Sequence, residues 1–407
     1  MRKAGLFMGL VALLWGTSAA IGQERFWLAQ CNPCESVAIH LCDPCGNGNG
    51  GFFTPFTFGG WIDVGVYTNS HGNSSNGPMF TGSKRRTDPV MNQLYFSAER
   101  EMNTRRGFDW GARTDFVYGA HAGSMQNYGD ETFDFGWGEN RHGYAMSAYQ
   151  LYGTLGYRNL SIKAGKFIGY VGWEASASKD NFFYSHSYCY WIEPATHSGV
   201  LATYDLSDRL SLSAGWTAGM DAGFQNRYND SSLLSGLAFT LTDNATIHYW
   251  INAGKMNNGF HRGEYRFDNN FAISHNDYFV QSLCLEWDLT ERFTYVLQYN
   301  LRNDNFAVND GSKVRDSSYG INNHFLYKLN DRWGVGTRFE WLRDNGGYII
   351  DDAGDYYQVT LGLNWNPRRN VSIRPEVRYD WCKGAAPFAD GTRSYQVSGG
   401  GGILVSF

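Results

Sequence analysis

Tyr-Gln-Val-Ser-Gly-Gly-Gly-Gly-Ile-Leu-Val-Ser-Phe, residues 395–407, is the stretch that decides the fold. Ile403, Val405 and Phe407 fall on one face of a strand, because side chains alternate along it. A soluble sheet that ended this way would offer an unpaired edge, although an ordinary last strand of such a sheet remains an alternative. A closed barrel instead pairs its last strand with its first. We predict that this stretch pairs with residues 56–68 and closes a ring, with Phe407 at a membrane interface.

The composition fits a barrel in a membrane. The 407 residues include 26 Tyr, 27 Phe, 14 Trp and 49 Gly, yet the mean hydropathy is only -0.42. Abundant aromatic residues with low mean hydropathy are typical of a barrel in which only alternate residues meet lipid. The net charge of -5 excludes a basic footprint for nucleic acid and a polybasic membrane-surface binder.

The first residues read as an export signal. Met1-Arg2-Lys3 is basic, and the apolar run from Leu6 to Trp15 is too short to cross a bilayer as a helix. Small residues follow it, as they do at secretory cleavage sites. We expect residues 1–22 to be a secretory signal peptide, which places the mature chain outside the cytoplasm.

A cysteine-rich and glycine-rich segment, residues 23–51, follows the signal. Its cysteines form two C-x-x-C pairs, Cys31 with Cys34 and Cys42 with Cys45. Export to an oxidising compartment favours disulfides, while four thiolates this close could instead hold zinc. The Gly-Asn repeat that ends the segment is typical of a flexible linker. We expect a periplasmic segment here, with no cofactor, before a barrel over residues 52–407.

From Phe52 onward the chain alternates in stretches of about ten residues, as strands of a membrane barrel do. Residues 371–381 place apolar side chains at every second position, with Arg374, Glu376, Arg378 and Asp380 between them. A soluble sandwich would bury the apolar face and expose the polar one. The aromatic residues at the strand ends instead favour lipid outside and a polar lumen inside.

The connections between strands come in two lengths that take turns. One set is short and polar, as in Leu206-Ser207-Asp208-Arg209-Leu210. The other set is long and rich in Gly, Asn and Asp, as in residues 119–143 and 170–196. We therefore predict an all-β fold, a transmembrane antiparallel β-barrel of about 16 strands with short periplasmic turns and long extracellular loops.

A series of motifs near the middle of the chain is more specific. Gly165-Lys166-Phe167 is followed by Gly172-Trp173-Glu174, by residues 181–188 (Asn-Phe-Phe-Tyr-Ser-His-Ser-Tyr) and by residues 193–200 (Glu-Pro-Ala-Thr-His-Ser-Gly-Val). This order resembles the OmpL-like β-barrel porins, a family of planctomycete-type outer-membrane porins. The resemblance covers residues 52–407 and leaves the two C-x-x-C pairs outside. It implies a barrel in the bacterial outer membrane with a porin role.

The third long loop, residues 170–196, is too aromatic for a floppy surface loop. We predict that it folds into the lumen and constricts it. The alternative is that it packs over the barrel wall or at a subunit contact. The residues expected at the constriction are Glu174, Asn181, His186, Tyr188 and Glu193.

Strand alternation also predicts which charges face the lumen. Opposed strips of charge would orient polar solutes, whereas mutual salt bridges would only stiffen the wall. The two signs roughly cancel, so no strong ion selectivity is predicted. The expected lumen-facing bases are Arg302, Arg338, Arg374, Arg378, Lys328 and His324, and the expected acids are Asp63, Asp115, Glu286, Glu340, Glu376 and Asp380.

The function expected from these features is passive diffusion of small hydrophilic solutes through the outer membrane. The alternative is a non-conducting scaffold or adhesin barrel that presents long surface loops. No G-x-S-x-G or H-E-x-x-H motif occurs, so we predict no enzyme and no catalytic residue. The expected partners are outer-membrane lipid, the solutes and, by analogy with porins, two further copies in a homotrimer, but no nucleic acid.

Overall fold

A computed structural model describes residues 56–72, 88–127, 133–137, 143–224, 230–256, 274–307, 313–347 and 352–407. The predicted signal peptide and the predicted disulfide cysteines, Cys31, Cys34, Cys42 and Cys45, lie outside these ranges. Their roles therefore stay predictions.

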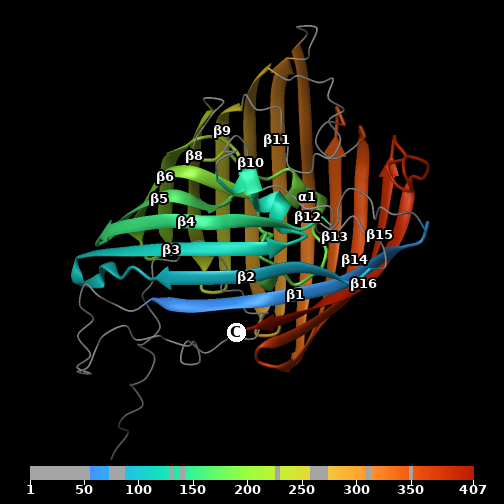
Figure 1. Cartoon of the computed structure of the whole chain (residues 1–407), viewed down its shortest axis with the longest axis horizontal. Helices are drawn as coiled ribbons and strands as arrows, with labels where there is room; N and C mark the ends of the chain where they lie inside the picture. The colour runs from blue at the N-terminus through green and yellow to red at the C-terminus, as the bar shows by residue number, and fades with distance from the viewer. Residues whose placement is uncertain are drawn as a thin grey trace, which may run out of the picture.

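Strands in strict sequence order form one closed antiparallel barrel (Figure 1). The prediction of an all-β barrel of about 16 strands is confirmed. The strands are β1 (Thr57–Asn69), β2 (Val90–Arg100), β3 (Phe108–Gly119), β4 (Ala145–Tyr157), β5 (Leu160–Ile168), β6 (Thr196–Ser207), β7 (Leu210–Thr217), β8 (Ser231–Thr242), β9 (Ala245–Met256), β10 (Ser274–Thr290), β11 (Phe293–Ala307), β12 (Lys313–Asn330), β13 (Trp333–Asp344), β14 (Gly354–Arg368), β15 (Val371–Lys383) and β16 (Tyr395–Ser406).

The barrel closes between its last strand and its first. The register of β16 on β1 runs from Trp61 opposite Ser406 to Asn69 opposite Ser398. Beyond the strand, Gly60 and Phe407 exchange both backbone hydrogen bonds at 2.9 Å. The predicted pairing of the final stretch with the strand near residues 56–68 is therefore confirmed.

The wall is apolar outside and polar inside. On β15 the outward Val377 is 57% exposed and Tyr379 is 41% exposed, whereas the inward Arg374 and Arg378 are at most 1% exposed. A lipid environment accounts for exposed apolar side chains on this scale, because water would penalise them. Within the described ranges, no helix combines the length and apolar character needed to cross a membrane.

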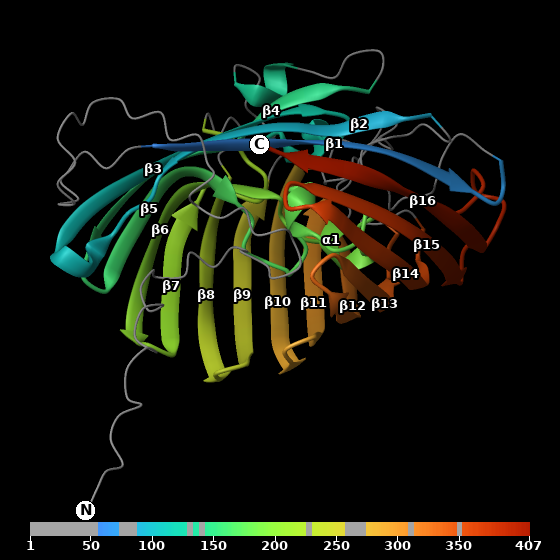
Figure 2. The same cartoon turned by 90° about the horizontal axis from the view of Figure 1, so that it is seen from below.

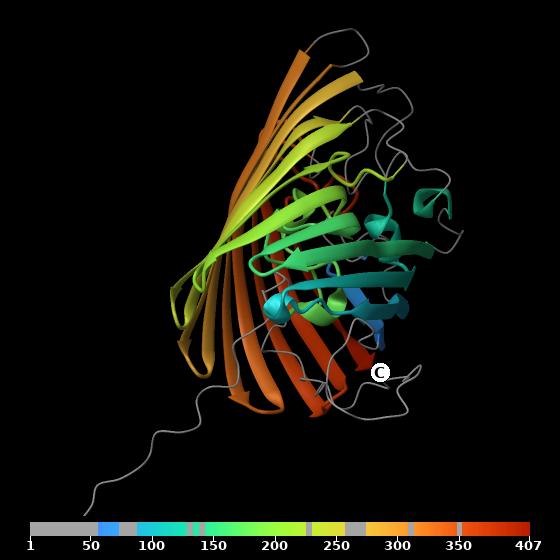
Figure 3. The same ribbon diagram turned by 90° about the vertical axis from the view of Figure 1, so that its left-hand side faces the viewer.

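The strands β10 and β12 are the longest, at 17 and 18 residues, and together with β11 they rise above their neighbours (Figure 3). The short helix α1 (Tyr188–Trp191) lies inside the ring of strands (Figure 2). Single turns of 3-10 helix accompany it at η1 (Thr104–Arg106), η2 (Ala122–Met125), η3 (Asp134–Trp137) and η4 (Ser178–Asp180). Helix α1 and η4 belong to the connection between β5 and β6, where the candidate site lies.

Candidate functional site

The connection between β5 and β6, residues 169–195, lies within the barrel, and we call it the lumen loop. Residues 181–195 are buried without exception. The loop contacts well-separated parts of the wall. The indole of Trp173 donates to Glu286 of β10 at 2.9 Å, and Tyr184 accepts a hydrogen bond from Asn92 of β2 at 2.9 Å.

Wall carboxylates hold the backbone amides of this loop. Glu376 of β15 accepts the N–H groups of residues 184 and 185 at 2.8 and 3.2 Å. Glu340 of β13 accepts the N–H groups of residues 188 and 189 at 2.7 and 2.6 Å. Buried backbone amides need such partners, and bonds to an ionised acceptor are stronger than neutral ones.

Wall guanidinium groups hold the carbonyls in the same stretch. Arg338 of β13 donates to the Ser185 carbonyl at 2.8 Å, and Arg378 of β15 donates to the His186 carbonyl at 2.6 Å. Arg338 also donates to the carboxylate of Glu174, within the loop, at 2.7 Å. The wall therefore meets each end of the peptide dipoles with the opposite charge.

The register explains why these charges act together. Arg338 and Arg378 lie level, one on each side of Thr360 of β14. Glu340 is two residues along from Arg338, and Glu376 is two residues along from Arg378, so all of them face inward. Alternating acids and bases on two strands thus line up opposite successive peptide groups of the loop.

Arg374 fixes the earlier part of the loop. Its guanidinium donates to the carbonyls of Ser178 and Asn181 at 2.6 and 3.1 Å. It also pairs with Asp63 of β1 at 3.1 Å, with both side chains 2% exposed. This contact joins the loop to β15 and, across the closing strand β16, to β1.

The aromatic residues 182–184 pack against inward-facing glycines of the wall. A Cβ added at Gly336 would lie 2.5 Å from Phe182, and one at Gly362 would lie 2.8 Å from Phe183. A Cβ at Gly65 or Gly402 would lie 2.4 or 2.8 Å from the Tyr184 ring. These glycines form two cross-strand pairs, Gly336 with Gly362 and Gly65 with Gly402. Glycine in these strands therefore permits the close approach of the loop.

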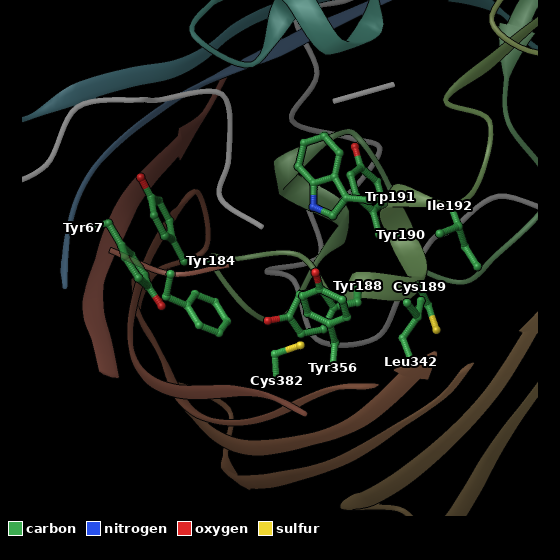
Figure 4. Packing of buried hydrophobic residues seen from close by; sticks show 11 residues of the cluster. Tyr67, Tyr184, Tyr188, Cys189, Tyr190, Trp191, Ile192, Leu342, Tyr356 and Cys382 are labelled. Atoms are coloured by element: carbon green, nitrogen blue, oxygen red, sulfur yellow. The ribbon is translucent and has the colours of Figure 1, made fainter. Parts of the chain in front are cut away.

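The aromatic side chains of the loop continue this packing toward the extracellular half (Figure 4). Tyr188 lies beside Tyr356 of β14, with ring centroids 5.2 Å apart, and donates to Asp380 at 2.7 Å. Tyr184 stacks on Tyr67 of β1 at 5.6 Å. The loop is thus packed as a core as well as hydrogen-bonded.

The C-terminal part of the loop is bound to β11 and to Asp221, which lies after β7. Glu193 accepts hydrogen bonds from Gln298 and Asn300, two inward residues of β11. The amides of Ala195 and Thr196 donate to Asp221 at 2.8 Å each. Contacts at both ends therefore fix where the loop enters and leaves the lumen.

A second segment, described over residues 120–127 and 133–137, packs against the lumen loop. His121 and His186 lie with ring centroids 5.2 Å apart, and Tyr190 stacks on His186 at 3.7 Å. Asp134 and Lys166 form an ion pair in which both side chains are fully buried. The Gly-Lys-Phe motif thus places its lysine under this segment.

The other predicted lumen residues differ in position. Asp115 binds Arg113 at 3.0 Å on β3, and Arg302 pairs with Asp304 on β11 at 2.7 Å. Lys328 pairs with Asp331 of a short turn at 3.3 Å, so it lies at the rim. The lumen loop contacts Arg338, Arg374, Arg378, Glu286, Glu340, Glu376 and Asp380, and His324 lies 4.0 Å from the loop residue Glu174.

The predicted loop residues are distributed along the same contacts. Glu174, His186 and Glu193 face wall side chains or the second segment, as described above. Asn181 closes a turn within the loop by donating to the Ala175 carbonyl at 2.6 Å. In the part of the chain that the structure describes, no three His, Cys, Asp or Glu side chains are placed to hold a metal ion.

Two features of the site were not predicted from the sequence: the packing of the loop on wall glycines and the position of Lys163 in the lumen. The inward glycines Gly65, Gly336, Gly362 and Gly402 lie on strands that the pattern identified, and an inward glycine is itself a signal of close packing. Lys163 lies between the outward residues Ile162 and Ala164 on β5, so the same alternation places it in the lumen.

Comparison with known proteins assigns the fold and family. The family described as "Putative beta-barrel porin-2, OmpL-like" matches residues 55–407. The chain belongs to this porin family. The resemblance inferred from the loop motifs is therefore confirmed, and the cysteine-rich segment, residues 23–51, lies outside the family match.

Solved outer-membrane proteins share the fold of this OmpL-like barrel at low sequence identity. The channel DcaP of Acinetobacter baumannii matches with a TM-score of 0.58 and 10% identity over 87% of this chain and 97% of that one. The anion-selective porin of Comamonas acidovorans gives 0.54 and 10% over 86% and 99%. OmpT of Vibrio cholerae, in its trimer form, gives 0.51 and 12% over 86% and 99%.

Proposed function

We propose that this OmpL-like porin lets small hydrophilic solutes diffuse passively across the outer membrane, through a lumen narrowed by the lumen loop. The observation that carries the proposal is the anchoring of residues 184–189 by Glu340, Glu376, Arg338 and Arg378. A loop bound at successive amides and carbonyls keeps one position, and a fixed loop gives a reproducible size limit. Membership of the porin family supports the same role.

We further propose outer-membrane lipid and two other copies of the chain as partners. Outward side chains such as Leu361 (58% exposed) and Val377 (57% exposed) require an apolar environment. The similarity to OmpT in its trimer form favours a homotrimer. Chemical crosslinking of the folded protein in detergent tests this, since a homotrimer yields a ladder that ends at three chains.

A non-conducting scaffold barrel is the second candidate, and a specific observation favours it. The inward Arg302, Arg338, Arg374 and Arg378 are at most 1% exposed, so their charges are used in holding neighbouring groups. A loop bound this tightly would close the lumen, and the barrel would then serve only to present its surface loops. The two candidates predict opposite electrical behaviour.

Reconstitution of the folded protein in planar bilayers separates the two candidates. Diffusion through an open lumen predicts stepwise current that rises linearly with voltage. A correctly folded barrel that inserts but carries no current would exclude the porin role and leave the scaffold. Insertion is checked independently by protection of the barrel from protease in vesicles.

A further inference from the structure

Lys163 of β5 faces the lumen and, unlike the wall arginines described above, it forms no ion pair within the described ranges. From its surroundings we infer that Lys163, with Tyr152 and Tyr170, forms a subsite for small anions on the permeation route. The ligand class is chloride or a small carboxylate. This inference rests on the proposed function and deepens it, because it names the solutes that the lumen favours.

The ammonium group of Lys163 lies in a box of aromatic rings. Its Nζ is 4.4 Å from the ring centroid of Tyr152, 5.2 Å from that of Tyr170 and 5.7 Å from that of Phe167. Aromatic faces stabilise a cation without neutralising it. The rings therefore fix the position of the ammonium group, which keeps its positive charge.

Tyr170 offers a hydrogen-bond donor to an anion beside Lys163. Lys163 donates a hydrogen bond to the Tyr170 hydroxyl oxygen at 2.5 Å, so the hydroxyl hydrogen can point away from the ammonium group. The Tyr170 ring is held by stacking on Trp250 of β9, with centroids 4.8 Å apart. An anion beside Lys163 would therefore meet an ammonium group and an oriented O–H donor.

Lys163 differs from the other inward-facing cations of the wall. It is partly exposed, whereas the lumen arginines that hold the loop are buried. Within the described ranges it has no carboxylate partner. The other inward cations of the described strands all have one: Arg113 with Asp115, Lys166 with Asp134, Arg302 with Asp304, Lys328 with Asp331, Arg338 with Glu174, Arg374 with Asp63 and Arg378 with Asp380.

The acids of the two strands beyond β4 form their ion pairs with another cation. Glu99 of β2 and Asp115 of β3 both bind Arg113, at 2.9 and 3.0 Å. Arg113 is opposite Tyr152 in the register of β3 with β4, and its own charge is offset by these two carboxylates. A cation that forms no ion pair, on the low-dielectric wall of a water-filled lumen, raises the local concentration of ions of opposite sign.

The reversal potential across a potassium chloride gradient tests the subsite in planar bilayers. Lys163→Gln should lower the chloride-to-potassium permeability ratio by about threefold to fivefold, the effect of a unit charge at about 4 Å in a watery environment. Lys163→Arg keeps the charge and should keep the ratio near that of the wild type. The matched control is Lys255→Gln, which removes a lysine from the outward side of β9 and should change nothing.

An unchanged ratio in conducting Lys163→Gln channels overturns the inference while leaving the proposed function in place. If the folded wild-type barrel carries no current, the proposed function fails and the subsite is tested without current. Trinitrobenzenesulfonate, an anionic amine reagent, should label Lys163 of the folded protein in detergent, as read by mass spectrometry. Benzoate should slow this labelling about threefold or more. Absence of labelling, or labelling that benzoate does not slow, overturns the inference.

Discussion

Glu376 of β15 accepts the backbone amide of Tyr184 at 2.8 Å, although 192 residues separate them in the chain. The same carboxylate accepts the hydroxyl of Tyr67 on β1 at 2.7 Å. One side chain therefore joins the lumen loop to two strands that flank the closing strand. The position of the loop depends on such contacts, and each can be removed without altering the outer face of the barrel.

Replacing Glu376 with Ala should loosen the loop. The buried amides of residues 184 and 185 would lose their acceptor, at a cost of about 1–3 kcal/mol for each orphaned group. We expect a lower free energy of unfolding in urea and a noisier single-channel current. Glu291→Ala, at an exposed turn on the periplasmic rim, is the control and should change stability by no more than about 0.5 kcal/mol. Equal effects of the two substitutions would contradict the anchoring role.

Gly65→Ala should disturb the loop through steric contact alone. The added methyl group would lie 2.4 Å from Tyr184, and overpacking of this kind costs about 1–3 kcal/mol. Gly399→Ala on β16 is the matched control, because its nearest neighbour would be 3.5 Å away. In the double variant Gly65→Ala with Tyr184→Ala, most of the cost should disappear. If the loss of stability persists when the tyrosine ring is absent, the strain lies within the wall and not at the contact with Tyr184.

Deletion of residues 176–190 should raise single-channel conductance if the lumen loop constricts the route. The deletion removes η4, residues 188–190 of α1 and the aromatic run 182–184, while the wall strands keep their own ladder of hydrogen bonds. Circular dichroism and resistance to protease verify that the barrel still folds. Conductance equal to that of the wild type would show that the route bypasses the loop.

Reversing two arginines together, Arg374→Glu with Arg378→Glu, tests the basic strip. The change should shift the reversal potential toward cations. It should also release the loop, because the carbonyls of Ser178 and His186 lose their donors. Breaking buried pairs of this kind costs about 3–5 kcal/mol each. Arg369→Glu on an exposed turn is the control, and a selectivity that stays constant would remove the strip from the route.

The cysteines of residues 23–51 offer a separate test. Intact mass spectrometry of the exported protein should show two disulfides among Cys31, Cys34, Cys42 and Cys45. Cys189 and Cys382 serve as internal controls, because they are free and buried and should take up an alkylating reagent only after unfolding. One zinc ion per chain with four free thiols would replace the disulfide prediction with a metal site.

Much of the wall could be predicted from the sequence because the side-chain period of a strand is two. That rule places Arg374, Glu376 and Arg378 on the inner face, and in the structure these side chains contact the lumen loop. The partners of these charges could not be predicted in the same way. Glu376 meets amides that are 191 and 192 residues distant, and no local pattern encodes such a contact.

The loop shows the same division. Its aromatic composition indicated a packed segment. The glycines against which Phe182, Phe183 and Tyr184 pack lie on β13, β14, β1 and β16, far from the loop in the chain. The inward position of Lys163 could have been predicted, since it falls between two outward residues of a strand that the pattern identified. The predicted lumen charges cluster in sequence, whereas Lys163 is a single, partly exposed cation on its strand.

The seam between β1 and β16 has a consequence for how the barrel is assembled. Tyr184 touches Gly65 on one side of the seam and Gly402 on the other, and Arg374 reaches Asp63 across it. An open sheet lacks half of this binding surface, so the loop can dock fully only when the final strand has joined the first. Docking of the loop and closure of the ring are thus thermodynamically coupled, and the loop acts as an internal brace against reopening at the point where the wall was last sealed.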